Sequence, residues 1–569
     1  MEYKQIQELR TTGKVQEAFE AAIEALLSDP DDRNVRNELA MCLVVKMGRT
    51  ATYAQRGEFF AYLNEVVNLH IPATGTDCAN QKVVNPILKF IIDCSRHNKA
   101  LDVADHLFDL VKQLQFVRPS GAYSRLLSIF AGLKNVHLQP WQGFSEFFEW
   151  WDCQYLRPSD FEVHLAAGYD SYRDGRRLSL AEQAYVMQSK AMLRDYAKGY
   201  YDRQEVLAFV IDLITLAQLH KSFVYPTYYA SRLLYAIDLK QEAVDALKDF
   251  IARCASTKMW AWAQLGDYLS DVNMRYAAYC KAITCHGPDN MRIGLHEKLA
   301  AIYESRGQYD RARAEYESAA ALRRRLQMTP APAIVAKQSE PWWAETTPAP
   351  DNYAIQVNDS KRAERFVFGK DTIAIVVTEV SPKVQYLSYI TDRMVFGRLN
   401  YASFLNEAPK VGDVYRCRVT IDHTTGASKI RSLHLEQSHL ARIPFIRHFR
   451  GKLTRKEGND YGFVGRNYVR YEYLQDHADG EDVIGYARPE FNLFYKKVFW
   501  NVFILEKVGD VQFSHEMVEE QWRKFPNPQE ILSQFRKRQA LQVDKSAPQP
   551  APDGAEPQAE TAEMTPNDL

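Results

Sequence analysis

Residues 296–326, HEKLAAIYESRGQYDRARAEYESAAALRRRL, decide the fold of the N-terminal part of this chain. Apolar residues recur with helical spacing on both sides of Gly307, which suits a turn between two helices. Ala312 and Ala319 are small at positions where paired helices approach each other closely. The segment therefore predicts a hairpin of two packed helices.

Related segments occur elsewhere in residues 5–326, where apolar residues keep helical spacing and glycine is sparse. Further units are marked by Gly13, Ala18, Ala22, Ala25 and Pro30, by Trp262, Leu265, Gly266 and Ala278, and by Ala243. With the 296–326 unit they resemble the tetratricopeptide family, whose repeat is about 34 residues long. Residues 50–199 show helical patterns without a clean repeat. The resemblance implies a tetratricopeptide-like helical solenoid over residues 1–327, a scaffold that binds a protein partner.

Two residue clusters in this helical block allow both a structural and a functional interpretation. The first is aromatic and consists of Trp141, Phe144, Phe147, Phe148, Trp150 and Trp151. We expect it to form interhelical core, the alternative being a docking face. The second is Arg323, Arg324 and Arg325, for which a solvated last helical turn is favoured over contact with phosphate.

The composition changes after the helical block and again at the C-terminal end. Residues 328–360 are rich in proline and predict an extended linker, with Trp342 and Trp343 anchored on a neighbouring domain. Residues 511–545 predict a helical segment, amphipathic over 526–541. Residues 546–569 are rich in Pro, Ala, Gln and Glu and predict a disordered acidic tail.

Residues 361–438 change to the two-residue period of β-strands and predict a small closed barrel. VFGRL at 395–399 and PKVGDV at 409–414 resemble the OB-type RNA-binding repeat of ribosomal and exonuclease proteins. The resemblance places four residues on a binding face, although core packing is an equal alternative for the aromatic ones: Tyr386, Tyr389, Phe396 and Arg398.

Residues 439–510 predict a second small barrel. KEGNDYGFV at 456–464 and YVRY at 468–471 are similar to a cold-shock domain, although the first-strand tryptophan of that family is replaced by Thr454 or Arg455. Adjacent exposed rings can stack unpaired bases, and Lys and Arg attract the phosphates. The predicted nucleic-acid-binding residues here are Lys452, Arg455, Lys456, Tyr461, Phe463, Tyr468, Arg470 and Tyr471. The alternative is a barrel that contacts protein, with its aromatic residues half-buried.

The sequence contains no complete catalytic motif. Phosphate-loop, nucleophile-elbow and HExxH patterns are missing, so we expect no enzyme, no cofactor and no metal site. The eight cysteines are scattered and are expected to be reduced and mostly buried, Cys280 and Cys285 included. The N-terminus lacks a secretory signal pattern and no stretch reaches membrane-spanning length, which favours the cytoplasm.

Net charge is −1 over the whole chain, so only the local basic excess around residues 442–470 argues for nucleic acid. We therefore expect a non-enzymatic adaptor with a multidomain fold: an all-α tetratricopeptide-like solenoid followed by two small OB-type β-barrels. The barrels would bind single-stranded RNA or DNA, with RNA favoured, and the helices would bind a protein partner. The main alternative is a protein–protein scaffold without nucleic-acid binding, and the third possibility is an enzyme with an unrecognised active site.

Overall fold

The computed structural model describes residues 2–509 except 74, 76–77, 163–177, 351, 392–395, 422–427, 437–439, 441–442, 444, 456–457 and 493–496. The chain divides into two units, Met1–Ala363 and Glu364–Leu569. The first is helical, and the second contains two sets of strands, one of which closes into a barrel. This confirms the predicted succession of a helical array and small β modules. In the described residues, however, the strands of 361–438 form an open five-stranded sheet and not the closed barrel that the sequence predicted, because its edge strands β3 (Phe396–Asn400) and β5 (Ser428–Glu436) do not pair. The predicted segments 511–545 and 546–569 lie outside the described residues.

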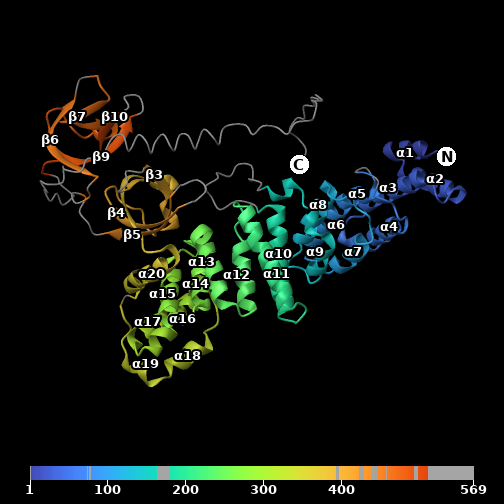
Figure 1. Ribbon diagram of the computed structural model, residues 1–569, viewed down its shortest axis with the longest axis horizontal. Coiled ribbons are helices and arrows are strands. Elements are labelled where there is room, and N and C mark those ends of the chain that lie inside the picture. Colours follow the sequence, from blue (N-terminus) through green and yellow to red (C-terminus); the bar gives the residue numbers. More distant parts are fainter. Residues whose placement is uncertain are drawn as a thin grey trace. The chain divides into compact units, whose positions relative to one another are not determined.

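The helices of the first unit follow one another in chain order, from blue to yellow-green in Figure 1. They are α1 (Tyr3–Thr11), α2 (Val15–Ser28), α3 (Arg33–Arg49), α4 (Arg56–Asn68), α5 (Ala79–Lys82), α6 (Val84–Arg96), α7 (Ala104–Val111), α8 (Gly121–Ala131), α9 (Phe144–Trp151), α10 (Leu180–Tyr196), α11 (Arg203–Leu219), α12 (Pro226–Ala236), α13 (Lys240–Phe250), α14 (Met259–Tyr268), α15 (Val272–Thr284), α16 (Asp289–Ser305), α17 (Tyr309–Arg325), α18 (Pro332–Gln338) and α19 (Pro341–Glu345). Helix α20 (Tyr353–Phe368) crosses the boundary between the units. Short helical turns are η1 (Tyr53–Gln55), η2 (Cys153–Tyr155), η3 (Pro158–Phe161) and η4 (Ile251–Ala255).

Side-chain caps fix several helix starts in this array. Asp32 accepts the backbone N–H groups of Asn34 and Val35 at the start of α3. Asp202 caps α11, and the Glu205 carboxylate accepts the Asp202 N–H in return. Such caps satisfy amide groups that the first helical turn leaves unpaired.

The 296–326 segment forms the predicted hairpin, α16 and α17. Gly307 has φ +71°, a left-handed conformation that glycine adopts without the strain of a side chain. Ala312 and Ala319 are fully buried where the two helices pack. The other small residues are used similarly: in α14, a Cβ added to Gly266 would lie 2.3 Å from the Tyr279 ring of α15. The packing between neighbouring helices thus explains the repeat pattern.

The aromatic cluster around α9 is core, as expected. Trp141, Phe144, Phe147 and Trp151 are buried, while Phe148 and Trp150 pack against the same cluster. Two arginines of the last turn of α17 form ion pairs with α16: Arg323 pairs with Glu297, and Arg325 pairs with Asp289.

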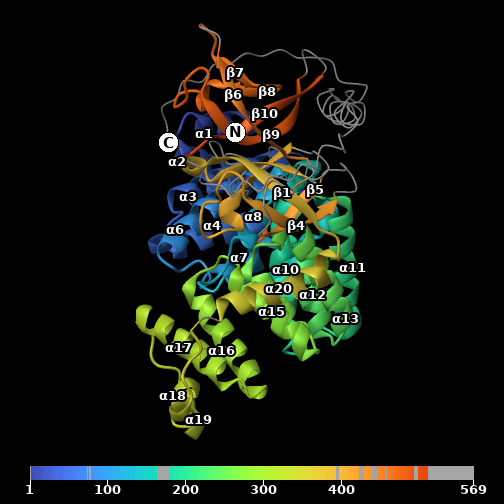
Figure 2. The same ribbon diagram turned by 90° about the vertical axis from the view of Figure 1, so that its left-hand side faces the viewer.

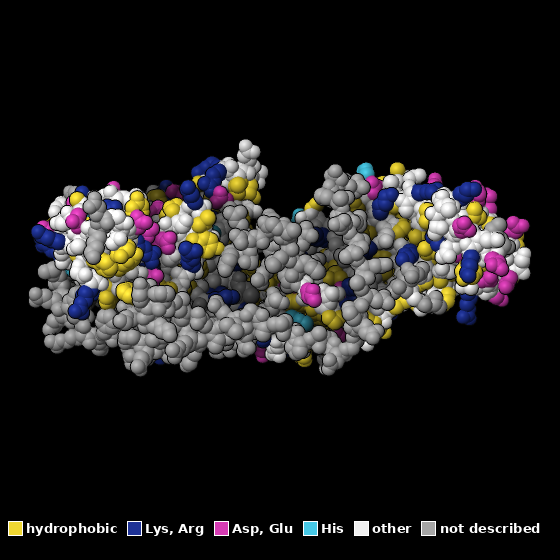
Figure 3. All heavy atoms as spheres, turned by 90° about the horizontal axis from the view of Figure 1, so that it is seen from above, with side chains coloured by type: hydrophobic (Ala, Val, Ile, Leu, Met, Phe, Trp, Pro, Cys, Tyr) yellow, Lys and Arg dark blue, Asp and Glu magenta, His cyan; other side chains and the backbone are white. Residues whose placement is uncertain are grey.

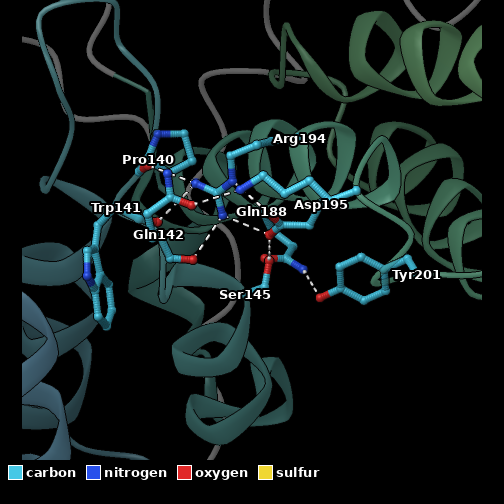
Figure 4. A network of polar contacts seen from close by, with 9 residues as sticks. Pro140, Trp141, Gln142, Ser145, Gln188, Arg194, Asp195 and Tyr201 are labelled. Carbon is cyan, nitrogen blue, oxygen red and sulfur yellow. Dashed lines mark hydrogen bonds and ion pairs between the residues drawn. The ribbon is translucent and has the colours of Figure 1, made fainter.

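A polar network joins α9 and α10 across the segment that precedes α9 (Figure 4). The Arg194 guanidinium donates hydrogen bonds to three backbone carbonyls, those of Pro140, Trp141 and Gln142. It also pairs with the neighbouring Asp195 carboxylate, which accepts a hydrogen bond from Ser145 Oγ at 3.2 Å. A helical side chain thereby satisfies the polar backbone of a loop, as burial requires.

The prediction of an extended linker over 328–360 is wrong. The segment folds back on α16 and α17: α18 pairs with α16 through Lys337 and Glu304, while α19 and the start of α20 contact α17. Arg313 donates to the carbonyl of Trp343, and the Trp342 ring stacks on Tyr309 with centroids 5.1 Å apart. The prolines start the short helices instead of preventing them, since proline tolerates the first helical turn. The predicted anchoring of the two tryptophans is confirmed.

A buried carboxylate fixes the beginning of α20 on α16 and α17. Glu315 Oε1 accepts hydrogen bonds from Asn352 Nδ2 at 2.8 Å and Gln356 Nε2 at 2.6 Å. Its other oxygen lies 2.6 Å from His296 Nδ1. The predicted domain boundary at 360/361 therefore falls inside a continuous helix that belongs largely to the helical array.

The second unit begins with a five-stranded sheet in the order β3-β2-β1-β4-β5. Its strands are β1 (Ile373–Ser381), β2 (Tyr386–Thr391), β3 (Phe396–Asn400), β4 (Val414–Ile421) and β5 (Ser428–Glu436), with turns η5 (Pro382–Val384) and η6 (Tyr401–Ser403). All of its described pairings are antiparallel, and β3 and β5 are its two edges.

The following strands close into a barrel in the order β10-β8-β7-β6-β9 (Figure 2). They are β6 (Arg447–Arg455), β7 (Tyr461–Val464), β8 (Asn467–Arg470), β9 (Asp482–Asn492) and β10 (Lys497–Lys507), with the turn η8 (Tyr471–Tyr473) after β8. The β8–β10 pairing is parallel, and the other described pairings are antiparallel.

The sheet and the barrel share one apolar cluster within this unit. It includes Val376 and Ile390 from the sheet and Tyr486 and Phe503 from the barrel. Arg488 on β9 donates to Thr378 Oγ1 and lies over the Phe396 ring. The outer side of β9 is therefore covered by protein.

Candidate nucleic-acid interface

Three aromatic rings form a continuous group on β7 and β8. Phe463 is directly opposite Tyr468, and Tyr461 is directly opposite Arg470. The Tyr461 and Tyr468 rings are stacked with centroids 5.6 Å apart, and the Phe463 ring meets both edge-on at 5.7 and 5.8 Å. Tyr461 and Phe463 are each 39% exposed. We call Tyr461, Phe463 and Tyr468 the aromatic platform.

The alternation of the strands places the aromatic platform on the outside of the barrel. Residues two apart in a strand share a face, so Tyr461 and Phe463 point out while Gly462 and Val464 point in. A Cβ on Gly462 would lie 3.1 Å from the Thr454 carbonyl and 3.2 Å from Leu474, so there is little room for a larger residue. The barrel interior is filled instead by Phe449, Leu453, Val464, Val469, Leu474, Val483, Ala487 and Val502.

Cations line the strand next to the platform. Thr454 pairs with Phe463 across β6 and β7, so Thr454, Lys452 and Arg450 share the outer face, and all three are exposed. Asp482 on β9 lies opposite Lys452 and partly neutralises the positive charge there. At its left, Figure 3 shows hydrophobic side chains beside Lys and Arg, with some Asp and Glu among them.

Positive charge also gathers at the turn between β7 and β8. Arg466 is exposed in this turn. Burial, and then the nearby Arg466 cation, lower the pKa of Arg447 from its usual value. The guanidinium of Arg447 lies over the Trp500 ring, 5.4 Å from its centroid. The platform is thus flanked by cations both along β6 and at this turn.

Arg470 is less available than the sequence suggests. Its guanidinium lies 2.9 Å from Glu490 Oε2, an oxygen that also accepts a hydrogen bond from Asn501 Nδ2. Glu490 belongs to β9 and Asn501 to β10, so the barrel topology brings them to β8. Sequence reasoning missed both residues, because nothing near 490 or 501 marks them as neighbours of residue 470.

The remaining predicted residues of the second module are placed differently. Tyr471 is 49% exposed in η8, beyond the end of β8 and outside the described ring contacts of the platform. Arg455 ends β6, and its backbone N–H donates to Asp479 Oδ1. Lys456 lies outside the described residues.

The residues predicted for the first module do not form one open face. Tyr386 and Tyr389 are three apart on β2 and therefore point to opposite sides. The Tyr389 ring covers Gly397 and packs against the core of the sheet. Phe396 packs into the cluster shared with the barrel, whereas Arg398 is exposed. For Tyr389 and Phe396 the geometry favours the alternative of core packing.

A cavity of about 510 Å³ between α16 and α17 is a weaker candidate for a binding site than the aromatic platform. Its cationic side chains already have partners: Arg325 pairs with Asp289, His296 contacts Glu315, and Arg292 donates to the Cys285 carbonyl. Over the described part of the chain, no cluster of three or more His, Cys, Asp or Glu is arranged to hold a metal ion. Within the same residues, no helix combines the length and apolarity that crossing a bilayer requires.

Comparison with known proteins finds one family model that matches part of the helical unit. A family model described as a domain of unknown function, DUF7017, matches residues 224–363 and ends where the first unit ends. Curated proteins give no match. A monomeric mutant of IFIT1 solved with Gppp-AAAA has a TM-score of 0.25 and 11% identity, covering 54% of this chain and 67% of that chain. A second IFIT1 mutant, solved with m7Gppp-AAAA, has a TM-score of 0.24 and 12% identity over the same shares.

Proposed function

We propose that the closed barrel is an OB-type, cold-shock-like module that binds single-stranded RNA, and that the chain is a non-enzymatic cytoplasmic adaptor. The strand order supports the OB assignment. Counted from β6, the strands pair in the order first, second, third, fifth, fourth and back to the first, with the third and fifth parallel. In OB-folds the second and third strands carry the oligonucleotide face.

The observation that carries the proposal is the outward position of the aromatic platform on those two strands. An exposed ring can stack on an unpaired base, worth about 1–3 kcal/mol per base. Tyr461, Phe463 and Tyr468 offer adjoining ring surfaces outside the barrel core. A barrel that used these rings only for its own stability would gain more by burying them.

The neighbouring charges suit a polyanionic strand. Arg450 and Lys452 lie along β6 on the same outer face, and Arg466 lies at the β7–β8 turn. Phosphates would contact these cations while bases contact the rings, so binding should weaken as salt increases. The helical unit would hold a protein partner, as stacked helical repeats commonly do.

The test is a titration of the full chain with fluorescent single-stranded RNA and with the same sequence as a duplex. We expect salt-sensitive binding of the single strand, preferred over the duplex, and a loss of at least tenfold in the double variant Phe463→Ala/Tyr468→Ala. The matched control is Tyr200→Ala, which removes a ring 74% exposed in the helical unit. Equal binding by the double variant and the wild type would refute the proposal.

Two observations favour the alternative of a protein scaffold. Glu490 neutralises Arg470 beside the platform, and the aromatic residues Tyr389 and Phe396 of the first module are packed against protein. An aromatic surface with balanced charge also suits a protein partner. Copurification of a stoichiometric protein that the Phe463→Ala/Tyr468→Ala variant loses, together with no RNA binding, would support the scaffold.

A further inference from the structure

The aromatic platform with its adjoining cations can accept a second ligand chemistry. Proline rings pack on aromatic side chains, and proline-rich segments bind aromatic-lined surfaces with little loss of entropy. Carboxylates would pair with Arg450, Lys452 and Arg466. A segment that combines prolines with carboxylates therefore matches the surface that we assign to bases and phosphates.

Residues 546–569 of this chain have that composition. Lys and Arg are absent from the segment, and its charged and proline residues are Pro548, Pro550, Pro552, Asp553, Glu556, Pro557, Glu560, Glu563, Pro566 and Asp568. It also lacks aromatic residues, so its complement must supply the rings. The aromatic platform supplies rings for the prolines, and Arg450, Lys452 and Arg466 supply positive charge for the carboxylates.

The connection to the barrel makes an intramolecular contact feasible. Strand β10 ends at Lys507 and is paired with β8, which carries Tyr468. The 36 residues between residues 509 and 546 would span about 54 Å as one continuous helix and more in an extended form, so residues 546–569 can reach the barrel surface. A tether whose span matches the separation raises the effective concentration of the segment at the barrel to about 1 mM, so even a weak contact is well populated.

We propose that residues 546–569 bind the aromatic platform and its flanking cations and compete there with the nucleic acid. The competition rests on the proposed function, whereas the binding of the tail to the barrel does not. RNA displaces the segment because phosphates and stacked bases offer more contacts. Residues 546–569 thereby lower the apparent affinity of the platform for nucleic acid, so short or weakly binding polyanions do not displace them.

The direct test uses the chain shortened to residues 1–545, which keeps every described residue, and a fluorescent peptide of residues 546–569. We expect salt-sensitive peptide binding that Lys452→Ser and Tyr461→Ala each weaken severalfold and Lys221→Ser leaves unchanged. A control peptide with all five carboxylates changed to amides should bind at least about fivefold more weakly. No binding of the acidic peptide, or equal binding of the amide peptide, would overturn the proposal.

The second arm compares RNA affinity of the full chain and of residues 1–545. We expect the shortened chain to bind single-stranded RNA about threefold to tenfold more tightly in low salt, with the difference vanishing near 0.5 M salt. Equal affinities in low salt would overturn the competition. If RNA binds neither chain while the acidic peptide still binds the platform, the proposed function fails and tail docking stands.

Discussion

Phe463 and Tyr468 face each other across β7 and β8, with ring centroids 5.8 Å apart and ring planes at 72°. The pair lies outside a barrel whose interior is already filled by aliphatic residues and Phe449. Its rings are therefore available to a ligand without any rearrangement of the core. The predictions below follow from this placement and from the contacts that support it.

The two rings should act as one surface. Phe463→Ala and Tyr468→Ala should each weaken single-stranded RNA binding by about 1–3 kcal/mol, and the double variant should lose less than the sum. The reason is that removal of one ring leaves its edge-on neighbour without support. A double-mutant cycle from fluorescence anisotropy measures the coupling. Strict additivity would show that each ring binds independently.

Lys452 should contribute through charge alone. The variant Lys452→Ser should lower the slope of log K against log salt by about 0.7, the value for one phosphate contact with a single strand. Titrations at four salt concentrations provide the slope. Lys221→Ser serves as the control, since Lys221 is exposed in the helical unit. An unchanged slope in Lys452→Ser would place the phosphates elsewhere.

Glu490 should weaken the affinity for polyanions. In Glu490→Gln the side chain keeps an oxygen that can accept from Asn501, while Arg470 loses the nearer of its two carboxylate partners and keeps Glu472 at 3.8 Å. The freed guanidinium should increase RNA affinity severalfold in low salt and steepen the salt dependence. The melting temperature of the barrel should fall, because Glu490 also lies 3.6 Å from the guanidinium of Arg488, whose side chain is only 13% exposed, so affinities are compared well below the melting temperature. Weaker RNA binding in this variant would contradict the assignment.

Glu315 should be important for the stability of the helical unit. Its carboxylate is 3% exposed and accepts hydrogen bonds from Asn352, Gln356 and His296. Glu315→Ala removes the acceptor of the buried Gln356 and Asn352 amides, although Asn352 keeps its bond to the Arg311 carbonyl, so the free energy of unfolding should fall by about 3 kcal/mol. Urea unfolding followed by far-UV circular dichroism measures the loss. The control Glu24→Ala, at an exposed position of α2, should cost less than about 1 kcal/mol. Equal losses in the two variants would contradict the proposed importance of the Glu315 contacts.

Glu182 should make stability depend on pH. Burial raises the pKa of its carboxyl group, although the N–H groups of Val224 and Tyr225 act in the opposite direction. An acid with a raised folded-state pKa stabilises the fold most below its unfolded pKa of about 4.3. That contribution is lost as the pH rises through the folded value.

Glu182→Gln stays neutral and keeps an acceptor oxygen for the same two N–H groups. The stability of the wild type relative to this variant should therefore decrease as the pH rises from about 4 towards 7. Urea midpoints of both proteins at several pH values give the difference. A difference that is constant with pH would show that the carboxyl group does not titrate differently in the folded chain.

The local sequence pattern was sufficient to predict the helical hairpins and the shared face of the aromatic platform. Gly307, Ala312 and Ala319 predicted α16 and α17 because turn conformation and close helix packing depend on residue size at fixed spacing. Tyr461 and Phe463 could be assigned to one face because side chains alternate along a strand. Both inferences use periodicities within a single element or between consecutive elements.

Contacts between distant segments could be decided only by the tertiary structure. The proline-rich segment folds onto α17 because Trp342, Trp343 and the Glu315 cluster bind it there, not because its own composition favours helix. Glu490 reaches Arg470, and Phe396 is covered, because barrel closure and the packing of the first sheet bring remote strands together. The sequence by itself determined which residues could form an aromatic and basic surface. The packing of distant strands decided which of them remain exposed, because burial depends on neighbours that local spacing does not specify.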